Sequence, residues 1–357
     1  MHFALWRSDE RRLSPATGVA LLLLLAIGGL FYVKWLPYCR KAIVASTSHS
    51  IGRSILTGSA AQPPAPSLKA AVDYSWAYGK AIWQAMLLGL LLGAALQEFA
   101  PVSWIAKWLG QSGWRSVAIG GLLAIPGMMC TCCAAPVVIG LRRRNASAAA
   151  ATAFWLGNTL LNPATLVFIG FVLGWKWLGL RIALGLPLVF GTGYLISRLT
   201  PPDEVRALQT QWSRAIVEGG VVHPTIKGWL RRFLRLLVGL IPEYVLLVLL
   251  LGAVRAWIFP PLGPAIGNEL QWIVIMAGAG LLFVIPTAGE VPIVQAMLAM
   301  GVGAGPAAAL MMTLAPISLP SLAMTGKVFS VRVLVVISLA VLAAGIVAGI
   351  LAVQFKY

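Results

Sequence analysis

Long stretches without a charged residue alternate with short polar stretches along this chain. Residues 13–33, 81–97, 116–141, 145–175, 182–197, 291–326 and 333–355 contain no Asp, Glu, Lys or Arg. A helix needs about 20 apolar residues to cross the roughly 30 Å hydrocarbon core of a bilayer, and most of these stretches approach or exceed that length. The pattern therefore predicts several membrane-crossing helices.

The N-terminal stretch predicts a first span from Thr17 to Pro37. We interpret it as an uncleaved anchor rather than a signal peptide, because it is long enough to span. The polar, Pro-rich stretch that follows, as far as Asp73, is typical of a loop. A second span is expected near Tyr78–Glu98, and a short interfacial helix at Val102–Leu109, where tryptophans flank a lysine.

A polar, arginine-rich stretch from Thr200 to Arg235 divides the chain. We interpret it as a cytoplasmic connection between two halves, with spans after it near Phe233–Phe259, Pro306–Met324 and Val331–Gln354, and a broken region near Gln271–Met300. This gives an N-terminal anchor and loop at residues 1–77, a first membrane repeat at 78–198, a linker at 199–232 and a second membrane repeat at 233–357.

Composition excludes the alternatives to a membrane protein. Hydrophobic residues make up 59% of the 357 residues and charged residues only 10%, against about 25% in soluble domains. The net charge of +17 fits cations that collect in loops on the inner face and meet anionic lipid, rather than a nucleic-acid partner. We predict an all-α, multi-pass protein of a bacterial inner membrane.

The two halves resemble each other. Gly120–Pro126 matches Gly280–Pro286 at a spacing of 160 residues, and Asn162–Leu166 lines up with Leu319–Ala323 at a spacing of 157. Paired broken segments at corresponding positions point to the binding site of a transporter, because helix breaks expose backbone groups that lipid cannot satisfy. Chance agreement between Leu-, Gly- and Ala-rich segments is the alternative.

Topology depends on how the two broken segments run. If 116–141 and 271–300 are re-entrant hairpins, the halves form an inverted repeat; if each crosses once, the halves are parallel. We favour hairpins, because Pro126 and Pro136 bracket a small, polar tip.

That tip carries the most distinctive chemistry in the chain. Cys130, Cys132 and Cys133 lie within four residues, directly after two methionines. Thiolates and thioethers are soft ligands that select thiophilic ions such as Cu(I) and Zn, and trivalent arsenic belongs to the same class. The alternative is that these cysteines only pack between helices as small hydrophobic residues.

Around these cysteines the sequence resembles the predicted permeases that include the ArsP-type organoarsenical permeases, from about Tyr78 to the C-terminus. The resemblance rests on Cys130-Thr131-Cys132, Pro136, Asn145-Ala146-Ser147 and Leu161-Asn162-Pro163, and on Pro286, Glu290 and Pro292 in the second half.

The resemblance implies ion-gradient-driven export of trivalent organoarsenicals across the inner membrane, and so arsenic resistance, although several members of the family have no known substrate. This chain departs from the family's pattern in three places. Thr131 replaces a serine, Asn145 replaces a glycine, and Cys133 is an extra thiol beside the pair.

Two acidic residues within apolar segments are candidates for coupling transport to an ion gradient. Glu243 lies inside a predicted span and Glu290 lies in the second break. A carboxylate within the bilayer is costly, so it typically serves as a proton relay or cation site. The alternative is a carboxyl that hydrogen-bonds a neighbouring helix for packing.

Polar residues near the helix-breaking prolines are further candidates for lining the path. Asn158 and Asn162 precede Pro163, and Ser318 lies beside Pro320 in the corresponding part of the second half. A proline in mid-helix frees a backbone carbonyl. Hydrogen bonds between packed helices are the alternative role.

The chain has no Gly-x-x-x-x-Gly-Lys-Ser/Thr motif for ATP, which favours a secondary transporter over an ATP-driven one. We expect no enzyme activity, cofactor, resident metal or nucleic-acid partner; membrane lipids and a small-molecule or metalloid substrate are the expected partners, and a homo-oligomer stays open. Two alternatives remain. One is a membrane thiol- or metal-handling protein, and the other is a transporter of a sulfur-containing or other small anion.

Overall fold

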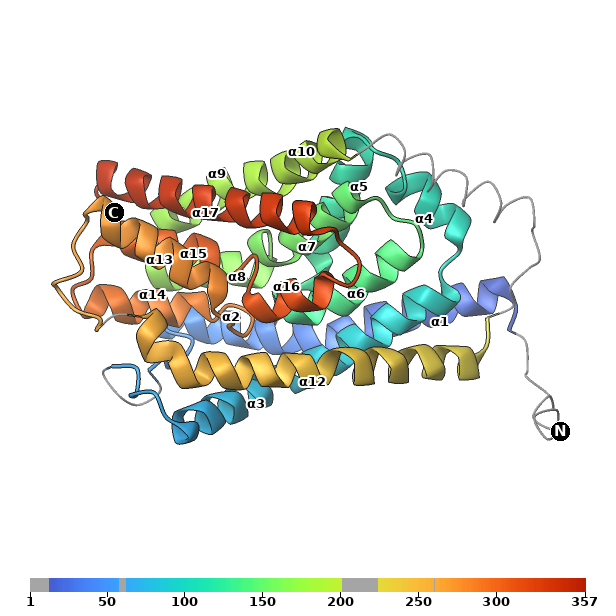
Figure 1. Cartoon of the computed structure of the whole chain (residues 1–357), viewed down its shortest axis with the longest axis horizontal. Helices are drawn as coiled ribbons and strands as arrows, with labels where there is room; N and C mark the ends of the chain where they lie inside the picture. Colours follow the sequence, from blue (N-terminus) through green and yellow to red (C-terminus); the bar gives the residue numbers. More distant parts are fainter. Residues whose placement is uncertain (1–12, 58–61, 201–223, 260) are drawn as a thin grey trace.

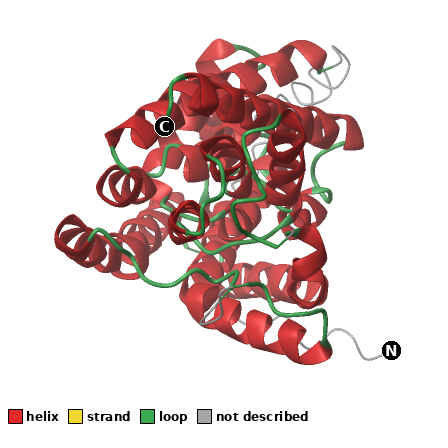
Figure 2. Cartoon of the chain, turned by 90° about the vertical axis from the view of Figure 1, so that its left-hand side faces the viewer, coloured by secondary structure: helices red, strands yellow, loops and turns green. Residues whose placement is uncertain are grey.

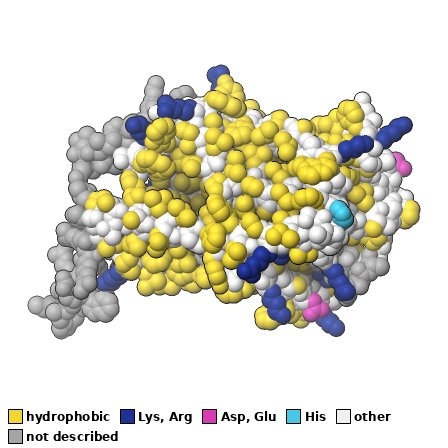
Figure 3. All heavy atoms as spheres, turned by 180° about the vertical axis from the view of Figure 1, so that it is seen from behind, with side chains coloured by type: hydrophobic (Ala, Val, Ile, Leu, Met, Phe, Trp, Pro, Cys, Tyr) yellow, Lys and Arg dark blue, Asp and Glu magenta, His cyan; other side chains and the backbone are white. Residues whose placement is uncertain are grey.

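The computed structural model describes residues 13–57, 62–200, 224–259 and 261–357, and every regular element within these ranges is helical. Seven helical stretches among the described residues are long and apolar enough to cross a membrane. Hydrophobic side chains cover most of the face in Figure 3, as expected for a surface in contact with lipid. The predicted all-helical, multi-pass architecture is confirmed.

The first predicted span belongs to a longer N-terminal helix with a widened turn. Helix α1 (Pro15–Leu30) leads into a π-helical turn at Phe31–Trp35 and continues as α2 (Leu36–Ser48). Pro37 has no N–H to bond the preceding turn, so the helix widens there instead of keeping its regular pitch. Single π-helical turns of this kind are frequent at functional sites.

Two long helices, α3 (Leu68–Phe99) and α12 (Ile226–Ile258), lie side by side along one edge of the molecule (Figure 1). They begin ten and seven residues earlier than the sequence predicted. The side chains of Ser67 and Thr225 accept hydrogen bonds from backbone N–H groups of the first turn, which lets each helix start there. Most of the predicted linker, residues 199–232, lies outside the described residues.

Each half contains two short helices separated by a break. Figure 1 shows one pair toward the right of the molecule and the other pair at its left-hand end. The first pair is α5 (Trp114–Ala124) and α6 (Thr131–Arg143), separated by a 3₁₀ turn at Ile125–Gly127; the second pair is α13 (Leu270–Leu282) and α14 (Glu290–Ala299).

The two breaks share an unusual backbone feature. Two residues after Pro126 and Pro286, respectively, Met128 and Ala288 adopt left-handed conformations with φ of 47° and 64°. Non-glycine residues rarely adopt this conformation, and it tends to occur where function demands it. The matched positions agree with the sequence alignment of the two halves.

The centre of the molecule is built from alanine-rich helices. In the most apolar window of Ala304–Thr325, 83% of the residues are buried, against 28% in Val331–Gln354 and 6% in Pro15–Ser48. Small side chains let helix backbones approach closely within a membrane.

Seen along the helices in Figure 2, the other segments pack around that centre. The central helices are α7 (Ala148–Leu160) and α15 (Ala304–Leu314); the remaining elements are α4 (Val102–Leu109), α8 (Pro163–Phe168), α9 (Trp175–Leu186), α10 (Thr192–Leu199), α16 (Leu319–Thr325) and α17 (Val331–Gln354), with π-helical turns at Ile169–Leu173 and Pro187–Gly191.

Glycines of α3 hold α6 in place. A Cβ atom at Gly89 would overlap the carbonyl of Cys133, and one at Gly93 would overlap the carbonyl of Pro136. This spacing of four residues puts both glycines on one face of α3, where the backbone of α6 lies against them. The close approach fixes the position of the cysteine-bearing end of α6.

We expect Gly89→Ala to destabilise the protein by about 1–3 kcal/mol, because the added methyl group meets rigid backbone rather than a movable side chain. Gly79→Ala on the same helix is the matched control, since nothing lies within 4 Å of a Cβ there. Thermal unfolding in detergent measures both variants. Equal melting temperatures would contradict the close packing of α3 on α6.

Candidate functional site

The first break places two thiols side by side at the start of α6. Cys130 is the N-cap of the helix and Cys133 lies in its first turn, with their Sγ atoms 2.8 Å apart. Cys132 faces a different neighbour, since its Sγ atom lies 3.7 Å from the hydroxyl of Ser318 in the second half. All three thiols are buried, whereas Cys39 is exposed.

The backbone of this break is supported from two other helices. Asn158 on α7 accepts a hydrogen bond from the Met129 N–H at 3.1 Å, and Trp35 on the N-terminal helix donates to the carbonyl of Pro126 at 2.9 Å. These bonds satisfy groups that the break removes from helical pairing. The first break is therefore held open by side chains rather than by lipid or solvent.

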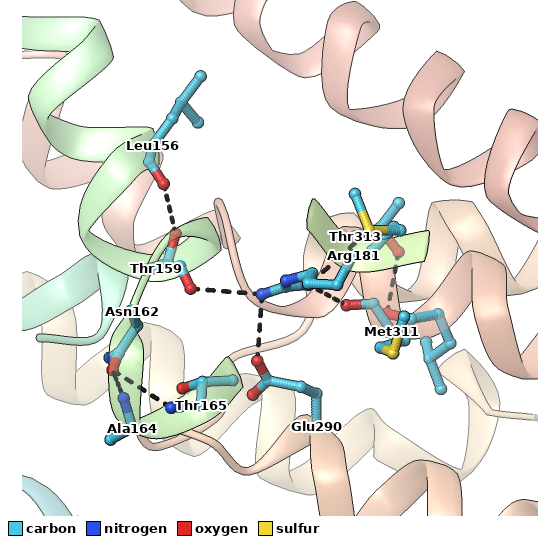
Figure 4. Close-up of polar contacts among 11 residues, drawn as sticks. Leu156, Thr159, Asn162, Ala164, Thr165, Arg181, Glu290, Met311 and Thr313 are labelled. Atoms are coloured by element: carbon cyan, nitrogen blue, oxygen red, sulfur yellow. Dashed lines mark hydrogen bonds and ion pairs between the residues drawn. The ribbon is translucent and has the colours of Figure 1, made fainter. Parts of the chain in front are cut away.

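In the second break a buried ion pair joins the two halves (Figure 4). Glu290 starts α14, and its Oε1 lies 3.2 Å from Nη2 of Arg181 on α9. The side chains of Arg181 and Glu290 are 0% and 2% exposed. Such burial is stable only when both charges are paired and further hydrogen-bonded.

Arg181 finds those further partners at the ends of broken helices. It donates to the carbonyl of Thr159 at 3.3 Å and to that of Met311 at 2.7 Å. Pro163, four residues after Thr159, has no N–H to bond that carbonyl, and Met311 lies in the last turn of α15. Carbonyls released in each half thus converge on one guanidinium.

A small cavity of about 10 Å³ lies between the two breaks. That is room for about one water molecule, so the site has no space for a larger solute in this conformation. The cavity is lined by Met129, Cys130, Thr159, Asn162, Thr165, Ile285, Pro286, Thr287, Ala288, Glu290 and Ala315.

The N-terminal helix adds a buried cation to the edge of this cavity. Lys34 lies in the π-helical turn, is 4% exposed and donates to the hydroxyl of Thr287 at 3.1 Å. Its ammonium also lies 5.4 Å from the ring centre of Tyr38. No carboxylate pairs with Lys34 among the described residues.

Several of the other predicted residues meet at the same place. Asn162 caps α8 and lines the cavity, Ser318 contacts Cys132, and Asn158 supports the first break. The side-chain nitrogens of Asn158 and Asn162 are buried without a hydrogen-bond partner within the described part of the chain. Glu243 lies apart: it is 42% exposed and pairs with Lys327 at 2.8 Å.

Lys34 and Arg181 were missed by the analysis of uncharged stretches. Lys34 lies near the end of the predicted span Thr17–Pro37, and Arg181 directly precedes the uncharged stretch 182–197, so neither was singled out as a buried charge. The missed signal was that each cation lies within a helix of membrane-spanning length, Pro15–Ser48 for Lys34 and Trp175–Leu199 for Arg181.

The charges of the site favour a negatively charged partner, whereas its thiols favour a soft, electron-accepting one. Lys34 and Arg181 are buried cations, and only Arg181 pairs with Glu290; the first residues of α6 and α14, where helices carry partial positive charge, lie at the cavity. The thiols of Cys130 and Cys133 add soft donors. Among the described residues no group of three or more His, Cys, Asp and Glu side chains has metal-binding geometry.

Comparison with known proteins agrees with the resemblance seen in the motifs. Residues 127–354 match a family of the ArsP type described as "Predicted permease". The chain is 46% identical over 336 residues to the UPF0718 protein YraQ of Escherichia coli K12, which covers 94% of this chain and 95% of that protein. It is 24% identical over 311 residues to the UPF0718 protein MJ0584 of Methanocaldococcus jannaschii, covering 68% and 84%. No solved structure matches.

We expect Arg181→Met or Glu290→Gln alone to destabilise the protein by about 3–5 kcal/mol, because each leaves a buried charge unpaired. The double variant should lose less free energy of unfolding than the two single variants lose together. The exposed pair of Lys327 and Glu243 is the control, with an expected coupling of about 0.2–1 kcal/mol. Thermal unfolding in detergent yields both double-mutant cycles, and equal couplings would contradict a special role for the buried pair.

Proposed function

The chain belongs to the predicted permease family, and from this premise we propose that it is an inner-membrane permease that exports a thiophilic solute, such as a trivalent organoarsenical, by using an ion gradient. The observation that carries this proposal is the pair of thiols at 2.8 Å beside a cavity formed by both halves. The seven apolar helices and the family assignment support the transporter class, and the thiol pair supports the substrate class.

The proposed binding step is a reversible condensation. Two thiols, Cys130 and Cys133, replace the two hydroxyl groups of an R–As(OH)₂ solute, forming two As–S bonds and releasing two water molecules. Hydrolysis on the opposite side of the membrane reverses the step and restores both thiols. Cys132 assists indirectly in this scheme, since its contact with Ser318 ties the start of α6 to the second half.

Glu290 is the proposed coupling residue. Protonation of its carboxyl would remove the charge that holds Arg181, which contacts carbonyls of both broken helices. Because the cavity has room for about one water molecule, the substrate requires an opening of the site, and release of Arg181 offers a route to it. The exposed pairing of Glu243 with Lys327 makes Glu243 a weaker candidate for the same role.

We further propose that the halves form an inverted repeat whose broken segments, 116–141 and 271–300, are re-entrant. The matched left-handed residues, Met128 and Ala288, support a common origin of the two breaks. The location of one helix pair at the left-hand end of the molecule and of the other toward its right supports inversion (Figure 1). In transporters of this kind the substrate binds where the breaks meet.

A second candidate substrate is a sulfur-containing or other small anion. The observation that favours it is the second buried cation: Glu290 pairs with Arg181, whereas Lys34 contacts the hydroxyl of Thr287 at the cavity and no carboxylate among the described residues. The unpaired amide nitrogen of Asn162 is a donor suited to an oxyanion.

Replacing both Cys130 and Cys133 with serine should reduce transport of a trivalent organoarsenical in everted membrane vesicles to background. Serine oxygen is a harder ligand that does not hold a thiophilic centre. Cys132→Ser should retain transport, and Cys39→Ser is the control for an exposed thiol. Full transport by the double variant would remove the thiols from the mechanism.

If the substrate is an anion, we expect Lys34→Met to abolish transport of that anion. Lys34→Arg keeps the charge and should retain a measurable rate of anion transport. Competition separates the two substrate classes: an unlabelled sulfur oxyanion such as thiosulfate should inhibit arsenical uptake if both use the site. Unchanged transport in Lys34→Met, with no competition, would eliminate the anion. The same vesicles serve for both measurements.

A further inference from the structure

A second polar hollow lies at the far end of α6, away from the thiols. It is lined by residues of α3, α4, α6 and α12 and the turn after α6, and its volume is about 430 Å³, within the range of small-molecule sites. From Cys130 the axis of α6 runs about 18–20 Å to this end. The arginine groove, as we name it, consists of Gln97, Val102, Arg143, Arg144, Arg232 and Arg235.

Two of its arginines donate hydrogen bonds to one buried residue, Gln97. Arg143 donates to the Gln97 side-chain oxygen at 3.1 Å, and Arg144 donates to the Gln97 carbonyl. Gln97 is 3% exposed and its own amide bonds the carbonyl of Gly93 in the preceding turn at 3.0 Å. The guanidinium groups are therefore held by backbone and amide groups, which leave their positive charges uncompensated.

The carboxylate beside the groove, that of Glu98, already has two partners. Glu98 pairs with Arg232 at 2.6 Å and accepts a hydrogen bond from the Thr225 N–H at the start of α12. Arg235 has no hydrogen-bond or ion-pair partner among the described residues. Within the part of the chain that the structure describes, the four guanidinium groups of the groove thus share one carboxylate, an excess of three positive charges.

Burial, and after it repulsion between the arginines, lowers the pKa values of two arginines of the groove. Burial, followed by the charge of Arg232, lowers the pKa of Arg144 to about 10. Burial, followed by the charges of Arg235 and Arg232, also lowers the pKa of Arg143. A bound anion would relieve this repulsion, and planar guanidinium groups match phosphate oxygens in pairs.

We propose that the arginine groove binds a phosphate group, carried by an anionic phospholipid headgroup or by a soluble phosphate compound, and thereby bridges the C-terminal end of α6 to α12. This site is separate from the thiol pair and does not depend on the permease proposal. Its location beside the predicted cytoplasmic stretch suits either source, because anionic lipids line that leaflet.

The test measures binding of a soluble short-chain phosphatidylglycerol to the full chain in detergent by microscale thermophoresis. Arg143→Gln with Arg235→Gln should weaken binding by about tenfold or more, since each charged contact contributes over 1 kcal/mol. The control replaces Arg231 and Arg332, two exposed arginines outside the groove, with glutamine. It should change binding less than twofold.

Arg143→Lys with Arg235→Lys keeps the charge but loses the paired donors, and its thermal unfolding shows whether the fold tolerates substitution here. An affinity for the lipid between those of the unaltered protein and the glutamine variant supports phosphate binding by the guanidinium groups of the groove. Displacement of the lipid by inorganic phosphate identifies a soluble phosphate as the source, and no displacement identifies the lipid. Equal losses in groove and control variants, or no binding of either probe to the unaltered protein, would overturn the proposal.

Discussion

One buried guanidinium holds the centre of this protein together. Arg181 is fully buried and pairs with Glu290, and it donates further hydrogen bonds to the carbonyls of Thr159 and Met311, which have no partner within their own helices. Breaks in membrane helices are stable only where other groups of the protein form hydrogen bonds with the backbone N–H and C=O groups that the break leaves unpaired. The charge, the breaks and the cavity beside them therefore depend on one another.

The same constraint explains why the N-terminal helix belongs to the site. Trp35 satisfies the Pro126 carbonyl at the first break and Lys34 reaches Thr287 at the second. Neither residue lies within the matched family region, 127–354; Lys34 contacts that region through Thr287, and Trp35 bonds Pro126 directly before it. A segment that resembled a plain anchor instead supplies one of the two buried cations beside the thiols.

Helix α6 links the two functional regions of the molecule. Its first turn presents Cys130 and Cys133, and its last turn contributes to the arginine groove. Glycines of α3 pack against the backbone of α6 between these two turns, so the helix is held as one rigid element. A ligand at either end would act on the same helix.

The sequence by itself determined the membrane class, the order of spans, the short helix at Val102–Leu109 and the two breaks, because hydrophobic length and proline act locally. The motif around Cys130 also indicated the predicted permease family. Only the tertiary structure decided which thiols are neighbours, since Cys133 rather than Cys132 lies against Cys130. It likewise decided the partners of Glu290 and Glu243, which look alike along the chain. Burial and pairing of a charge depend on helices distant in sequence, and a one-dimensional pattern does not contain them.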